Sequence, residues 1–274
     1  MDSISLSSSI ELVAGSGFVL NVEQRAALQT SLAILKKNYK FQRIMFWGKI
    51  LGIKQDYFIA QGRGEDEVQD KKYLYSFNCM DWFLLSSVTD SMIDEVSKAE
   101  QSRFIGDPSF MYKHKMSSQR KMSGAEDEAV SKVNEEMRLA VTIHHIEEDV
   151  SIAPRGAYIK SPFGLVQINR SFGGLNDMEA RKLENFMHFR KPKNVKKSIQ
   201  EMGQWSPDID FLDVLSDDIP KGSWSLQFES AGKVCVLRSL LWMGLTFYHV
   251  PMTQQHGYVY IGDGMKNLNL VFMV

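Results

Sequence analysis

The chain has 274 residues, of which 44% are hydrophobic and 24% charged, and its formal net charge is −1. This balance predicts a globular protein with a sizeable core, organised as one large domain or two modest lobes. It excludes a global electrostatic attraction to nucleic acid or anionic membranes. The two cysteines, Cys79 and Cys235, are too few for a disulfide framework and favour a reducing compartment. Residues 1–17 lack the basic and apolar regions of a secretory signal, and no run reaches the ~18 apolar residues of a membrane helix.

The N-terminal part is expected to form a helix followed by three strands. Residues 21–38 predict the helix because Leu28, Leu32 and Leu35 recur on one face, and Asn21 with Gln24 forms a capping-box pattern. The strands are expected at 43–47, 56–60 and 73–77. The first two are apolar on both faces, which predicts cover on both sides by helices or by a partner. Four aromatic residues exceed the needs of one small core, and some are expected to face a partner: Tyr57, Phe58, Tyr73 and Tyr75.

The middle of the chain alternates polar and helical patterns. Residues 113–128 are polar and aperiodic, which predicts a mobile loop. Residues 126–150 predict a long helix with two apolar stripes, and such a helix tends to lie between two surfaces. Residues 176–187 predict a further helix, with Asn176 and Glu179 in capping-box positions.

The C-terminal part is expected to be a strand-rich antiparallel meander. Strands are predicted at 224–228, 234–242, 246–250 and 258–261, with a tight turn at 262–264. Strict alternation predicts that Trp224, Leu226 and Phe228 point inward.

The search for chemistry gives no catalytic, cofactor-binding or metal-binding residue. The six histidines show neither an HExxH motif nor zinc-ligand spacing and are interpreted as surface or core residues: His114, His144, His145, His188, His249 and His256. Residues 208–218 hold five Asp, but Leu212 and Asp213 replace the oxygen ligand and the Gly of a calcium loop, so a solvated acidic loop is favoured. Gly62 and Gly64 lack a phosphate-cradle pattern. Cys235 falls in a strand pattern and is read as a buried structural thiol.

Two further features have open readings. The basic run 190–197 lacks interleaved aromatic residues, so a solvated linker is favoured over a nucleic-acid patch, with contact to an acidic protein surface as the alternative. The five tryptophans are interpreted as core or interface anchors: Trp47, Trp82, Trp205, Trp224 and Trp242. A core position is expected for Trp224 and Trp242.

Several long blocks, met in order along the chain, resemble a known family. The resemblance is carried by FWGKILGIKQDYFIAQG (46–62), LYSFNCMDWFLL (74–85), PRGAYIKSPFG (154–164), LRSLLWMGLTFYHVP (237–251) and GYVYIGDGMKN (257–267). These blocks are similar to the radial spoke head protein 9 family of motile cilia and flagella, and the resemblance runs from about residue 10 to residue 274. It departs most at 111–135.

The resemblance implies a non-enzymatic structural subunit of the axonemal radial spoke head, without cofactor or metal. It implies packing with homologues of radial spoke head proteins 4 and 6 and of radial spoke head protein 1. It also implies contact with central-pair projections through the assembled head, and a location in the cytoskeleton of the axoneme. A second copy of the chain is a further candidate partner; nucleic acid and membrane are not expected.

From the residues alone, the expected fold is α+β: a largely antiparallel sheet packed against a few helices, with two lobes in one continuous unit. The domain is expected to span 1–274, with an N-terminal lobe at about 18–110 and a C-terminal lobe at about 151–274. Two rival functions stay open: an enzyme or small-molecule binder with an unfamiliar site, which needs a deep pocket lined by convergent polar groups, and a nucleic-acid binder acting through 190–197.

Overall fold

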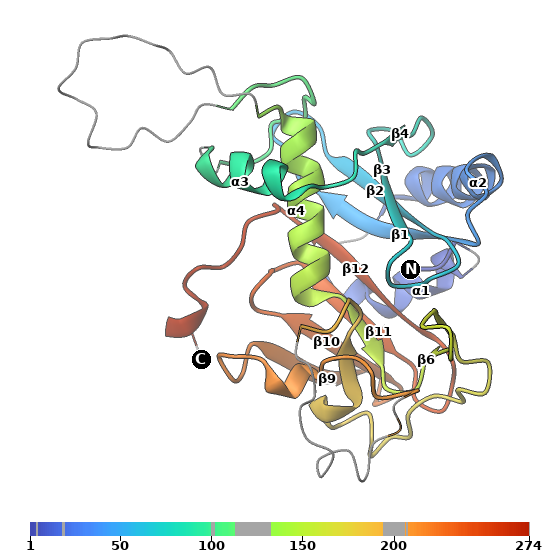
Figure 1. The fold of residues 1–274 in the computed structure, drawn as a ribbon. Coiled ribbons are helices and arrows are strands. Elements are labelled where there is room, and N and C mark those ends of the chain that lie inside the picture. The colour runs from blue at the N-terminus through green and yellow to red at the C-terminus, as the bar shows by residue number, and fades with distance from the viewer. Residues whose placement is uncertain are drawn as a thin grey trace.

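One eight-stranded sheet organises the molecule (Figure 1). In this computed structural model the described residues are 1–273, apart from 4, 18–19, 100–101, 113–132, 194–205 and 207. The strand order is β4-β3-β2-β1-β12-β11-β10-β9. The N-terminal strands are β1 (Arg43–Ile50), β2 (Tyr57–Arg63), β3 (Lys71–Ser76) and β4 (Phe83–Leu84), and the C-terminal strands are β9 (Trp224–Glu229), β10 (Val234–Ser239), β11 (Leu245–His249) and β12 (His256–Gly262). Each set is an antiparallel meander, and a parallel pairing of β1 with β12 joins the two. The predicted α+β fold is therefore confirmed, with the meanders as two halves of one sheet.

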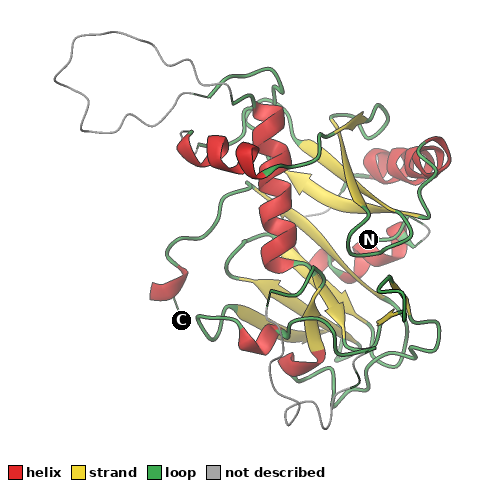
Figure 2. Ribbon diagram, viewed as in Figure 1, coloured by secondary structure: helices red, strands yellow, loops and turns green. Residues whose placement is uncertain are grey.

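Helices cover both faces of the sheet (Figure 2). One face packs against α1 (Leu6–Leu12), η1 (Ala14–Ser16) and α2 (Val22–Asn38), and the other packs against α4 (Glu135–Val150), beside which lies α3 (Asp90–Lys98). Smaller elements are the paired strands β5 (Ile152–Pro154) and β8 (Phe186–His188), the hairpin β6 (Tyr158–Lys160) and β7 (Val166–Ile168), and the short helices η2 (Leu183–Asn185), η4 (Leu215–Asp217) and η5 (Leu270–Phe272). Both faces of β1 and β2 are thus covered, as predicted, and the covering helices belong to the same chain.

The predicted N-terminal helix is confirmed together with its cap. In α2 the Gln24 amide donates to Asn21 Oδ1 at 2.7 Å, and the Asn21 amide donates to Gln24 Oε1 at 3.1 Å. Leu28, Leu32 and Leu35 are buried against the sheet. The sequence predicts this helix correctly because its cap and its apolar stripe both act within one helix.

The predicted helix over 126–150 begins later than expected. Asn134 has extended backbone angles and accepts a hydrogen bond from the Met137 amide at 2.8 Å, so α4 starts at Glu135. Residues 126–132 lie outside the described part, as does the predicted mobile loop at 113–128. The position of α4 between the sheet and outer elements agrees with its two apolar stripes.

The predicted helix over 176–187 is wrong. The reciprocal Asn176–Glu179 hydrogen bonds do form, at 2.8 and 3.0 Å, but only a turn follows them. Lys182 is extended, a short η2 comes next, and residues 186–188 pair with β5 as β8. The tertiary pairing overrides a correct local cap signal, because helix propagation beyond a cap depends on packing.

In the C-terminal meander the predicted alternation largely holds. Trp224 is buried, Leu226 and Phe228 are half-buried against the core under α4, and Gln227 is exposed. The incomplete burial of Leu226 and Phe228 follows from the position of β9 at the edge of the sheet.

Gly48 lies at the joint between the two meanders. It follows the bulge at which Trp47 is inserted opposite β2, and it begins the parallel pairing with Tyr260 of β12. Its φ is +155°, and a Cβ there would lie 2.0 Å from the Tyr260 carbonyl oxygen. Only glycine allows the two backbones to approach this closely.

We expect Gly48→Ala to lower the free energy of unfolding by about 1–3 kcal/mol or more, because the clash is with backbone that cannot turn away. Urea unfolding followed by circular dichroism measures the change. Gly173→Ala is the matched control, since a Cβ at Gly173 meets no atom within 4 Å. Equal midpoints for the two variants would contradict this account of the joint.

Candidate interaction surfaces

Glu147, near the end of α4, is a buried carboxylate at the centre of a polar network. It is 5% exposed and accepts hydrogen bonds from Trp47 Nε1 at 2.9 Å and from the Tyr258 hydroxyl at 2.8 Å. It also accepts from Gln61 Nε2 at 3.1 Å and forms an ion pair with Lys71 Nζ at 2.7 Å. Burial alone would raise the pKa of this carboxyl, but the charge of Lys71 and the hydrogen bonds outweigh burial and lower the pKa. The network fixes α4 to β1, β2, β3 and β12 at one point.

Glu135, in the first turn of α4, is fully buried and equally well satisfied. Its carboxylate accepts the amides of Ile105, Gly106 and Asp107, at 2.8, 2.6 and 3.0 Å. The hydroxyls of Tyr57 and Tyr112 also donate to it. Burial again opposes ionisation, but these donors outweigh it and lower the pKa of Glu135. The positive end of the helix dipole acts in the same direction. This carboxylate therefore clamps the loop after residue 104 onto α4.

The acidic stretch 208–218 is not the solvated loop that the sequence favoured. Asp210 is 3% exposed and binds the Arg155 guanidinium through two contacts, at 2.6 and 2.8 Å. Asp218 accepts from Trp224 Nε1 at 2.7 Å and lies 2.8 Å from His188 Nε2. Asp210, Asp213 and Asp218 thus hold other segments of the chain, because a carboxylate removed from water requires a partner, whereas Asp208 and Asp217 are exposed.

The basic run 190–197 begins inside the protein, so the solvated-linker reading is wrong at its start. Arg190 is 8% exposed and pairs with Asp213 at 2.8 Å. Lys193 is exposed and lies 3.8 Å from Glu148. Lys196 and Lys197 lie outside the described residues. Arg190 is therefore paired with an internal carboxylate, and the exposed cations of the described part of the run are Lys191 and Lys193.

The buried tryptophans, like the buried carboxylates, have hydrogen-bond partners inside the protein. Trp47, Trp224 and Trp242 are buried, as expected for the last two, and each indole N–H donates to a carboxylate. Trp82 is half-buried, and Trp205 lies outside the described residues. These side chains are core anchors.

Among the described residues, the histidines and cysteines form no metal-binding cluster, and His114 lies outside this part of the chain. Within the described part of the chain, no group of three His, Cys, Asp or Glu residues is placed to hold a metal ion. Cys79 and Cys235 are buried free thiols, and burial raises the pKa of each to about 12. At neutral pH both thiols are therefore protonated and weakly nucleophilic. No helix in the described part combines the length and apolar character required to cross a bilayer.

His249 is buried and held as a neutral ring. The Leu175 amide donates to its Nε2 at 3.1 Å, so Nδ1–H donates to the Gln255 carbonyl at 3.1 Å. Burial lowers the pKa of this imidazole below its usual range, since a charged ring would lose solvation and one hydrogen bond.

The unfolded chain therefore binds a proton near pH 6.5 that the folded chain resists. We expect the free energy of unfolding to fall as pH drops below about 6.5, with a slope of up to ~1.4 kcal/mol per pH unit from this group. Urea midpoints measured from pH 7.5 to 5.5 test the expectation. His249→Gln should reduce the slope and His144→Gln should not. Part of the dependence should remain in both variants, because burial also lowers the pKa of His145 and of His256. The same slope in both variants would contradict the assignment.

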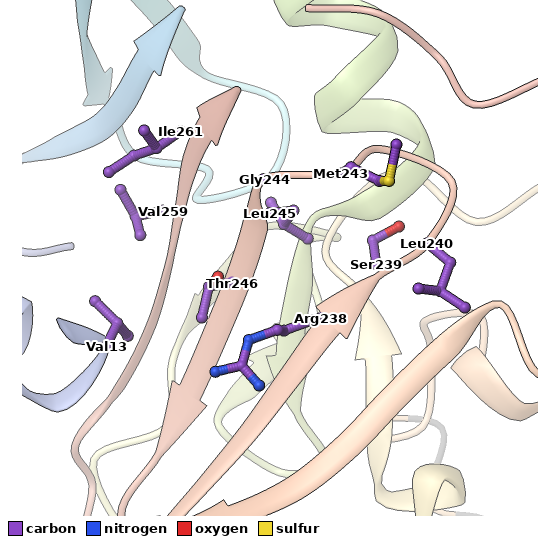
Figure 3. A pocket seen from close by; sticks show the side chains of 10 residues that line it. All are labelled: Val13, Arg238, Ser239, Leu240, Met243, Gly244, Leu245, Thr246, Val259 and Ile261. Carbon is purple, nitrogen blue, oxygen red and sulfur yellow. The ribbon is translucent and has the colours of Figure 1, made fainter. Parts of the chain in front are cut away.

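Two cavities lie on the C-terminal half of the described structure. One of about 220 Å³ is lined mainly by apolar side chains at the ends of β10, β11 and β12 (Figure 3). The other, of about 230 Å³, lies between the end of α4 and the segment around Pro220 and includes Asp218 and Trp224. Glu135 and Glu147 line neither cavity, and Asp218 is already held by two donors. Two buried nitrogens of residues that line the second cavity, His188 Nδ1 and Arg190 Nε, have no hydrogen-bond partner among the described residues. Of the two cavities, only this one therefore has the polar lining that a small-molecule site requires.

Exposed apolar side chains cluster at two places on the surface of the described structure. One is the segment 268–273, here called the C-terminal apolar segment, where Phe272 is 88% exposed and Leu268 78% exposed. Asn267 fastens it to the β10–β11 turn through Leu240 and Leu241, and Met243 of that turn is also exposed. The other is around β4, with exposed Met80, Phe83 and Leu84. The four aromatic residues expected in part at an interface are not exposed: Tyr57, Phe58 and Tyr75 are buried and Tyr73 is half-buried.

The fold and its surfaces define a class: an α+β protein whose described part holds buried carboxylates in internal hydrogen bonds and ion pairs and exposes apolar segments at its surface. The comparison with known families is specific. The radial spokehead-like protein family matches residues 5–179, and the chain belongs to this family. It is 58% identical to the radial spoke head protein 9 homolog of Danio rerio over 280 residues. It is 47% identical to that of Homo sapiens over 279 residues and 46% identical to that of Xenopus tropicalis over 278 residues. Each alignment covers 100% of both chains.

Proposed function

We propose that this chain is a non-enzymatic structural subunit of the radial spoke head, in the axoneme of motile cilia and flagella. The observation that carries the proposal is full-length identity of 46–58% to relatives named radial spoke head protein 9 homolog. A protein so similar over its entire length is expected to share the fold of these relatives. The buried network around α4 supports the proposal, because a load-transmitting subunit needs a body that does not deform.

We infer the finer role from the same family resemblance. The chain is needed to assemble the spoke head, and the assembled head contacts the central pair and regulates ciliary motility. Its direct partners are homologues of radial spoke head proteins 4 and 6 and of radial spoke head protein 1. The C-terminal apolar segment suits such contacts, since exposed Val271 and Phe272 stand beside the anchored Leu270. An interface of the obligate kind buries at least ~2,000 Å² and is apolar at its centre.

Co-purification across a salt series tests the proposal. The tagged full chain is expected to retain the other spoke head subunits from low to high salt, because screening weakens exposed charge pairs and hardly affects buried apolar contacts. Phe272→Glu should weaken retention. Phe163→Glu is the matched control, because Phe163 is 92% exposed in a distant hairpin turn. Failure to retain any spoke head subunit at any salt concentration would overturn the assembly role.

A further inference from the structure

The strand β9 forms a long edge of the eight-stranded sheet, and no described strand pairs with its outer side. The opposite edge is β4, which has only two residues, whereas β9 has six. Edge strands expose unpaired backbone groups, and natural proteins usually shorten, charge or cover them. An edge strand of six residues therefore needs a structural explanation.

The hydrogen-bond pattern shows which groups of β9 face outward. The Leu240 amide donates to the Ser223 carbonyl at 2.9 Å, which continues the β9–β10 register and makes this pair a hydrogen-bonded one. Hydrogen-bonded and non-hydrogen-bonded pairs alternate along an antiparallel ladder. The N–H and C=O groups of Trp224, Leu226 and Phe228 consequently point away from β10. Among the described residues none of these groups has a hydrogen-bond partner.

The side chains of this edge are also arranged for strand addition. Trp224, Leu226 and Phe228 lie on the face packed under α4, and the last two are only half-buried. Ser225 and Gln227 lie on the other face, and no residue from 224 to 228 is charged. Of the charged groups around it, Glu229 is paired with Arg238, which also donates to Gln227 Oε1 at 3.0 Å, and the Arg181 guanidinium lies over the Phe228 ring. An added strand would cover apolar surface without meeting a like charge.

We propose that β9 pairs antiparallel with β9 of a second copy of this chain, with Leu226 opposite its own counterpart. In this register Trp224 lies opposite the partner's Phe228, and Ser225 lies opposite the partner's Gln227. The outward backbone groups then meet one another, and the apolar faces of both strands stay on the same side. A shift by one residue would place apolar side chains opposite polar ones. The strand is therefore complementary to itself, as a two-fold interface requires.

The pairing deepens the proposed structural role, because it gives the subunit a two-fold contact with which to build a larger assembly. Strand addition supplies main-chain hydrogen bonds over a modest area. The dimer should thus dissociate on dilution. The test uses the purified chain alone, so a negative result overturns the dimer and leaves the assembly role to its own co-purification experiment.

Sedimentation velocity and light scattering across a dilution series measure the dimer. Wild type is expected to change from dimer to monomer. The double variant Ser225→Glu with Gln227→Glu places glutamates opposite glutamates in the proposed register, and its dissociation midpoint should move to at least about tenfold higher concentration. The double variant Ser225→Glu with Gln227→Lys places Glu opposite Lys and should dimerise like wild type.

Both double variants alter the face away from α4, and circular dichroism should show an unchanged fold. A wild-type chain that stays monomeric at every concentration would overturn the proposal. So would an acidic double variant that dimerises as well as the charge-swapped one. A monomer that acquires a strand from a different spoke head subunit at β9 would show that the edge has another occupant.

Discussion

Glu147→Ala is expected to lower the free energy of unfolding by about 3–5 kcal/mol. The substitution leaves Lys71 buried without its counter-charge, since the Lys71 side chain is 8% exposed and its ammonium lies 2.7 Å from the removed carboxylate. It also leaves the indole N–H of Trp47 and the hydroxyl of Tyr258 without their acceptor. Chemical denaturation measures the loss.

The adjacent Glu148→Ala is the matched control. Glu148 is 32% exposed and lies 3.8 Å from the exposed Lys193, so its removal should cost less than about 1 kcal/mol. Lys71→Met combined with Glu147→Ala should be less damaging than the sum of the single changes, because no unpaired buried charge remains. Additive losses, or equal losses at 147 and 148, would show that the ion pair does not anchor α4.

Glu135→Ala is expected to cost at least about 3 kcal/mol, because several buried donors lose one shared acceptor and each unsatisfied donor costs about 1–3 kcal/mol before relaxation. The amides of Ile105, Gly106 and Asp107 should then exchange with solvent much faster than in wild type, since all three donate to this carboxylate. Hydrogen–deuterium exchange resolved at single residues measures the local effect.

The control for this site is Glu136→Ala, one residue along the same helix turn. Glu136 is half-buried, and its side chain has none of the donors that bind Glu135. Exchange at 105–107 should be unchanged in this variant. Unchanged exchange in Glu135→Ala as well would mean that the loop is held to α4 by its apolar contacts alone.

The elements that could be predicted from the sequence are those whose determinants are local. The α2 helix is set by a cap and a stripe within 18 residues, and the C-terminal meander by alternation and short turns. The failure at 176–187 has the opposite cause: Asn176 and Glu179 form their cap, but the pairing of β8 with β5 decides the continuation.

The buried carboxylates could not be predicted, because their partners are remote in the chain. Glu135 meets Tyr57 across 78 residues, Glu147 meets Lys71 across 76, and Asp210 meets Arg155 across 55. A glutamate on a helix or an aspartate in a loop is ordinarily solvated. Nothing in the local pattern separates these residues from their exposed neighbours. The position of β9 at the edge of the sheet could not be predicted either, since the strand order depends on the parallel pairing of β1 with β12.

Electron cryotomography of axonemes from ciliated cells that lack this chain tests most directly whether the chain is a building block of the radial spoke head. We predict that the density of the spoke head is reduced or lost, and that re-expression of the wild-type chain restores both the head and the normal beat. Spoke heads of full size and unchanged shape in axonemes without the chain would contradict the claim.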